Sequence, residues 1–122
     1  MFHKDFSIML YSSDVLADKT FWQAIGFTIT DKEDLMGYPT FDMKVDATSP
    51  VTFTVFDLEF IKQVSPEVAN HQPSILFETE HLAELHSNIK AHAPAIGDIQ
   101  DQPFRNFNFQ APSGHYYAVK EK

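Results

Sequence analysis

The sequence predicts an α+β fold built from two consecutive βαβββ modules. The order of strand, helix and further strands occurs twice, each time within about 60 residues, which indicates an internal duplication. The 122-residue chain has 43% apolar and 14% aromatic residues, enough for one domain with a real core. No linker-like segment separates the halves. We therefore expect a single domain over residues 1–122, with module 1 at about 1–64 and module 2 at about 70–122.

The first half carries the signals of a strand, an amphipathic helix and three more strands. Asp14 is a typical helix N-cap residue, and Gly26 suits the position just after a helix. Between them, Ala17, Phe21 and Ile25 recur at helical spacing, so we expect them on the buried face. The expected elements are a strand at 6–10, a helix at 15–25, strands at 27–30, 39–45 and 51–56, and a helical turn at 58–63.

The second half repeats this order. Leu82, Leu85 and Ile89 mark a helix at the spacing i, i+3, i+7, which Pro94 and Gly97 end. Strands are expected at 74–79, 104–109 and 116–119, the last two joined by a turn at 112–114. His81, His86 and His92 lie on the helix without an i, i+4 pair, so we interpret them as solvent-facing residues.

Charge and composition exclude several classes of function. Seventeen acidic and nine basic residues give a net charge of −8, so neither nucleic acid nor an anionic membrane is an expected partner. No apolar run approaches the roughly 20 residues that span a bilayer, and the start lacks the apolar core of a secretion signal. Cysteine is absent, which removes disulfides and thiol chemistry. These features together favour a cytoplasmic protein.

Three short segments resemble the vicinal oxygen chelate superfamily, which includes glyoxalase I, ring-cleaving dioxygenases and bleomycin-resistance proteins. They are Asp14 with Phe21-Trp22-Gln23-Ala24-Ile25-Gly26-Phe27, Pro103-Phe104-Arg105 with Phe107-Asn108-Phe109, and Ala111-Pro112-Ser113-Gly114-His115. Together with the duplication, they cover nearly the whole chain. The resemblance implies two modules forming a cupped mixed sheet with helices on its outer face, and it implies a homodimer.

The resemblance also locates the positions at which the family's enzymes hold a divalent metal. These positions correspond to Ser7, Ser74, Ala118 and one residue of the strand at 51–56. Ala118 has no lone pair to donate, serine hydroxyls are poor neutral ligands, and the strand holds no acid, amide or imidazole. We therefore expect neither a metal nor another cofactor. A site rebuilt from the shifted residues His3, His71, Glu59 and Glu78 is the alternative.

Strand alternation predicts which side chains line the cup. If Ser7 faces the concave side, Met9 and Tyr11 do so too, whereas Phe6, Ile8 and Leu10 pack under the helix. Asn106, Asn108 and Gln110 fit either face. The predicted ligand-binding residues are Met9, Tyr11, Leu76, Glu78, Phe104 and Tyr116.

Three interpretations remain open: a binding protein, an enzyme, and a regulatory or structural dimer that has no ligand. The leading hypothesis is a metal-independent small-molecule binding protein, similar to the bleomycin-resistance branch, whose aromatic and acidic cup between the modules sequesters a ligand. The acid would favour a cationic or hydrogen-bond-donating ligand. The alternative is a metal-dependent lyase, isomerase or dioxygenase using the shifted ligands. No catalytic residue can be assigned from the sequence, because no nucleophilic triad or phosphate-binding glycine loop occurs.

Overall fold

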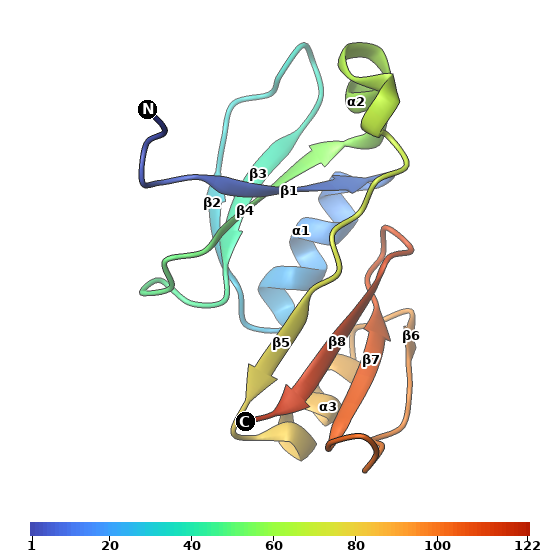
Figure 1. Ribbon diagram of the computed structural model, residues 1–122. Helices are drawn as coiled ribbons and strands as arrows, with labels where there is room; N and C mark the ends of the chain where they lie inside the picture. The colour runs from blue at the N-terminus through green and yellow to red at the C-terminus, as the bar shows by residue number, and fades with distance from the viewer. The chain divides into compact units, whose positions relative to one another are not determined.

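The computed structural model describes all residues, Met1–Lys122, and divides the chain into two compact units (Figure 1). The N-terminal unit spans Met1–Gln72 and the C-terminal unit spans Pro73–Lys122. None of the helices has both the length and the apolar character needed to cross a membrane.

The N-terminal unit is a four-stranded mixed sheet with one helix against it. Its strands follow the order β1-β4-β3-β2, with β1 parallel to β4 and the other pairs antiparallel. The elements are β1 (Ser7–Ser12), α1 (Val15–Ala24), β2 (Thr28–Asp31), β3 (Thr40–Lys44), β4 (Thr52–Asp57), α2 (Leu58–Val64) and a 3-10 turn at Pro66–Val68.

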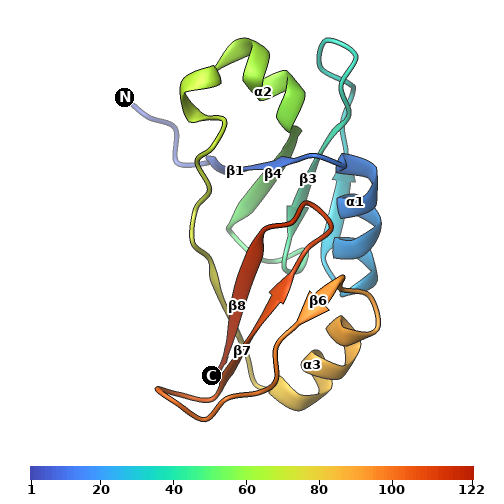
Figure 2. The same ribbon diagram turned by 90° about the vertical axis from the view of Figure 1, so that its right-hand side faces the viewer.

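The C-terminal unit repeats this topology. Its sheet has the order β5-β8-β7-β6, with β5 parallel to β8. The elements are β5 (Leu76–Thr79), α3 (Leu82–Lys90), β6 (Ala95–Ile96), β7 (Asn106–Gln110) and β8 (Tyr116–Glu121). In Figure 2, α1 and α3 each lie along one side of their own sheet. The α+β class and the two βαβββ modules are thereby confirmed.

The core of the N-terminal unit lies between α1 and the sheet. Asp14 caps α1 by accepting a hydrogen bond from the Ala17 N–H at 3.1 Å, as expected. Phe21 and Ile25 are buried as predicted, and Asp18 and Trp22, which were not in the predicted set, are buried as well. The prediction that Phe6 packs under the helix is wrong: β1 starts only at Ser7, and Phe6 is 78% exposed.

The core of the C-terminal unit gathers Phe107, Phe109 and Val119 beneath α3. His86 packs against this core and is half-buried, so it is less solvent-facing than predicted, whereas His81 and His92 are exposed as predicted. Its ring meets Phe107 edge-on with centroids 4.9 Å apart, and its Nε2 atom lies 2.8 Å from the Gly97 carbonyl oxygen. The strand β6 was not predicted, because two residues are too few to show an alternating pattern.

Candidate functional site

Each sheet has one face covered by a helix and a second face, called here its open face. On β8, Tyr117 and Val119 are buried on the helix side, whereas Tyr116 is exposed and Ala118 half-buried. Paired residues of neighbouring strands project from the same face. The register therefore assigns three rows to the open face of the C-terminal sheet: Tyr116 with Gln110, Leu76 with Ala118 and Asn108, and Glu78 with Lys120 and Asn106.

The middle of this open face carries large apolar side chains beside a small one. Ala118 lies at its centre on the inner strand β8 and has only a methyl side chain. Leu76 is 50% exposed beside it and Tyr116, two residues away on β8, is 62% exposed. Large apolar side chains exposed around a small residue offer contact area to a flat ligand.

One end of the open face carries compensating charges. The Lys120 Nζ atom lies 3.6 Å from the Glu78 carboxylate and 5.3 Å from the centroid of the Phe104 ring. Lys120 was absent from the predicted site, although the alternation that gave Tyr116 and Ala118 reaches it one step later. Lys120 offsets the charge of Glu78, so Glu78 no longer provides a reason to expect a cationic ligand at this end of the open face.

The amides of β7 belong to the open face, which settles a question that the sequence left undecided. Phe107 and Phe109 are buried, so Asn106, Asn108 and Gln110 project to the other side. Asn106 donates to the Phe104 carbonyl oxygen at 2.5 Å, and Gln110 donates to the Gly114 carbonyl oxygen at 3.0 Å. These bonds hold the loops at both ends of β7. Asn108 is exposed and carries the amide that remains available to a ligand.

The open face of the N-terminal sheet is more polar. Met9 is 43% exposed and Tyr11 is half-buried on β1. On the strands beside it, the Thr54 hydroxyl donates to the Asp42 carboxylate at 2.6 Å, and Lys32 Nζ lies 3.6 Å from the same carboxylate. Sequence reasoning missed Asp42, because only the register of β3 against β4 places it opposite Thr54.

The residues at the family's metal positions do not fit a divalent ion. Ser7 is an exposed hydroxyl at the start of β1, and Ser74 precedes β5 in an irregular segment. Ala118 supplies no donor atom. On β4, the carboxylate of Asp57 accepts a hydrogen bond from the Glu59 N–H at 2.8 Å and caps α2. Neutral hydroxyls are weak ligands for the metals that such sites hold.

The shifted candidates are not brought together either. Nowhere in the chain do three His, Asp or Glu side chains gather closely enough to hold a metal ion. His3 Nδ1 accepts from the Asp5 N–H at 3.0 Å in the N-terminal segment, and Glu59 pairs with Lys62 at 3.2 Å. His71 lies exposed between the 3-10 turn and β5, and Glu78 pairs with Lys120.

Comparisons with known proteins identify the fold. No protein-family model matches the sequence, and no curated protein matches it significantly. Solved structures do match, each over nearly the full length. The antibiotic-binding protein TnmS3 from Streptomyces sp. CB03234 is 13% identical with a TM-score of 0.72, covering 99% of this chain and 98% of its own.

Two further structures connect the fold to different activities. A lactoylglutathione lyase from Agrobacterium tumefaciens is 16% identical with a TM-score of 0.71, covering 98% of this chain and 94% of its own. A bleomycin-binding protein from Streptomyces verticillus, solved with copper(II)-bleomycin, is 16% identical with a TM-score of 0.66, covering 100% and 98%. The chain therefore has the fold of these antibiotic-binding and lactoylglutathione lyase structures, which is the fold that the sequence resemblance predicted.

Proposed function

We propose that this protein binds a small molecule on the open faces of its sheets, without a metal and without transforming it. The observation that carries the proposal is the open face of the C-terminal sheet, where Leu76, Phe104 and Tyr116 are each at least 44% exposed. Exposed apolar side chains near polar anchors are typical of ligand-binding surfaces. Glu78 and Asn108 supply the anchors here, and Met9 and Tyr11 are the candidate contacts on the N-terminal sheet.

The donor chemistry of the chain supports binding rather than catalysis. The sequence resemblance assigns Ser7, Ser74 and Ala118 to positions where the family's enzymes place metal ligands, and together these residues offer two hydroxyls and a methyl group. A lyase or dioxygenase of this fold needs a Lewis acid to stabilise developing charge on its substrate. TnmS3 and the Streptomyces verticillus protein, whose names state that they bind an antibiotic and bleomycin, have the same fold.

The same surfaces suit a homodimer, which the family resemblance implies. The Tyr116 side chain is 62% exposed, so its apolar ring surface is in contact with water. Covering this surface with a ligand or with a second copy of the chain is energetically favourable. Native mass spectrometry of the untagged protein, purified without chelator, measures both the subunit number and any retained molecule. We expect a dimer of the 13.9 kDa chain; a monomer at micromolar concentration contradicts this part of the proposal.

Truncation of the exposed tyrosine tests the binding surface. We expect Tyr116→Ala and Tyr11→Ala each to weaken binding of metal-free bleomycin by about 1–3 kcal/mol, roughly 5- to 150-fold, if the rings are buried against the ligand. Isothermal titration calorimetry in the presence of EDTA measures the loss. Phe2→Ala is the matched control, because Phe2 is an aromatic residue fully exposed in the N-terminal segment.

The outcomes separate binding from catalysis. Saturable binding in EDTA that both tyrosine variants weaken supports the proposal. No binding in EDTA, combined with no organic molecule retained in native mass spectrometry, contradicts it. Binding that needs added Zn²⁺ or Ni²⁺, with turnover of a lactoylglutathione-type thioester or its precursor, would favour the metal-dependent lyase.

A further inference from the structure

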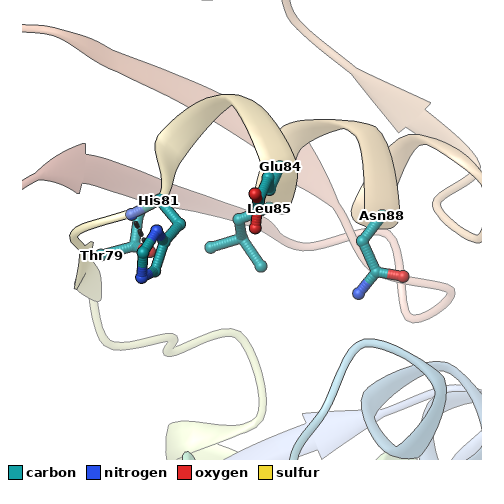
Figure 3. A pocket seen from close by; sticks show the side chains of 5 residues that line it. All are labelled: Thr79, His81, Glu84, Leu85 and Asn88. Atoms are coloured by element: carbon teal, nitrogen blue, oxygen red, sulfur yellow. Dashed lines mark hydrogen bonds between the residues drawn. The ribbon is translucent and has the colours of Figure 1, made fainter.

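A pocket of about 310 Å³ lies on the helix side of the C-terminal unit, apart from the open face (Figure 3). Its lining residues come from the end of β5 and the adjoining side of α3: Thr79, His81, Glu84, Leu85 and Asn88. On β5, Leu76 and Glu78 project to the open face, so Thr79 projects to the opposite side by strand alternation. A ligand on the open face of the C-terminal sheet therefore does not cover the residues that line the pocket, and a ligand in the pocket does not cover the open face.

The spacing of the lining residues places them on one stripe of the helix. Counted from His81, the other three helix residues follow at i+3, i+4 and i+7, the positions that share a helix face. Figure 3 shows the side chains of His81, Leu85 and Asn88 extending from α3 toward the same side. Leu85 is half-buried and forms the apolar part of the pocket, and the residues on either side of it are polar.

The polar groups of this pocket have hydrogen-bonding capacity to spare. No salt bridge reaches Glu84, whereas Glu59, Glu78 and Glu121 are each paired with a cation. The side chain of His81 does not cap α3; its backbone N–H donates to the Thr79 hydroxyl at 3.0 Å, and its carbonyl oxygen accepts from the Leu85 N–H at 2.9 Å. The amide of Asn88 is likewise exposed. One carboxylate, one amide and one imidazole thus face the pocket beside an apolar floor.

We propose that this pocket binds a small organic cation, an alkylammonium or alkylguanidinium ion. The cationic head would meet the Glu84 carboxylate and the Asn88 amide oxygen, which lie one helical turn apart, and the alkyl chain would cover Leu85. The partial positive charge of the helix N-terminus, about half an elementary charge, opposes this at the His81 end. The full negative charge of Glu84 outweighs it, and the net charge of −8 on the chain adds to the attraction.

The test compares three four-carbon probes that differ in charge: n-butylammonium, n-butanol and butyrate. Amide shifts in ¹H–¹⁵N NMR spectra of the full chain report where each probe binds. We expect saturable shifts for n-butylammonium at residues of α3 and at Thr79, weaker shifts for n-butanol, and none for butyrate. Butyrate binding as well as n-butylammonium, or no saturable shift with the cation, would overturn the proposal.

A pair of charge-neutralising variants tests the role of Glu84. Glu84→Gln is expected to weaken n-butylammonium binding roughly two- to fivefold, the range typical of one exposed ion pair. Glu80→Gln removes a neighbouring exposed carboxylate that does not line the pocket, and it should leave the affinity unchanged. Equal weakening in both variants would show a general effect of net charge and would overturn the site. The spectra themselves report whether each variant is folded.

Discussion

Lys120 is the single residue that most changes the chemistry of the candidate site. Without it, Glu78 would give the open face of the C-terminal sheet a net negative charge. With its Nζ atom 3.6 Å from Glu78 and 5.3 Å from the ring of Phe104, it makes this end of the face neutral overall. A ligand there meets apolar and aromatic surface with one paired ion at its edge. Half-exposed ion pairs of this kind add little to the stability of the fold. The effect of Lys120 is therefore on which ligands suit this surface.

A second residue, Met36, adopts a backbone conformation that its side chain disfavours. It lies at φ 50° beside Gly37 at φ 84°, in a tight turn closed by two hydrogen bonds between Leu35 and Tyr38. Two residues with positive φ are typical of the turn that prefers Asn-Gly.

Replacement of Met36 should therefore stabilise the protein. Met36→Asn is expected to raise the free energy of unfolding by up to about 1 kcal/mol, because Asn tolerates this conformation. The exposed fraction of Met36, 72%, means that little packing is lost. Urea denaturation measures the gain. Met36→Val, a branched residue in the same place, should lower stability, and a gain in that variant would contradict the explanation.

Among the elements, the connection between β3 and β4 depends on one carboxylate. The Thr48 hydroxyl donates to Asp46 at 2.6 Å and the Thr48 N–H donates to the same oxygen at 2.8 Å. These hydrogen bonds, the hydroxyl first, lower the pKa of Asp46 below its ordinary value of 3.8.

The lowered pKa gives the turn a defined pH dependence. A carboxyl group with a lower pKa in the folded state stabilises the fold above pH 3.8, and this contribution disappears as the pH falls through the folded value. NMR titration of the Asp46 carboxyl carbon should give a midpoint below 3.8, and Thr48→Val should move that midpoint upward. An unchanged midpoint in the variant would mean that Thr48 does not cause the shift.

At the scale of the whole molecule, the duplication predicts that equivalent core positions of the two units contribute similarly to the free energy of unfolding. Val55 pairs with Leu10 and Phe41 in the N-terminal sheet, and Val119 pairs with Phe77 and Phe107 in the C-terminal sheet. Both valines are 1% exposed, and each lies on the inner strand that pairs in parallel with the first strand of its unit, β4 with β1 and β8 with β5.

Truncating either valine should be similarly costly. Val55→Ala and Val119→Ala are each expected to lower the free energy of unfolding by about 2 kcal/mol, from two lost methyl groups and the cavity left behind. Chemical denaturation followed by circular dichroism measures the loss. Val51→Ala, at a site 43% exposed, should change stability by less than about 0.5 kcal/mol. A loss confined to one of the two core variants would argue against equivalent units.

The sequence by itself determined the topology and the faces of the strands. Hydrophobic alternation has a period of two residues and helical stripes recur every three to four, so the local pattern indicates which residues of β1 or β8 share a face of the sheet. The same local signals located the cap at Asp14 and the glycine after α1, which has a φ of 111°. All of these depend on neighbours along the chain.

Only the tertiary structure decided which side chains from separate strands meet. The pairing of Glu78 with Lys120, of Asp42 with Thr54 and of His86 with Gly97 joins residues 11 to 42 positions apart. Such contacts are set by strand register and by the packing of α3, which no local pattern encodes. The tertiary structure thus made Glu78 part of an ion pair and packed the half-buried ring of His86 against Phe107.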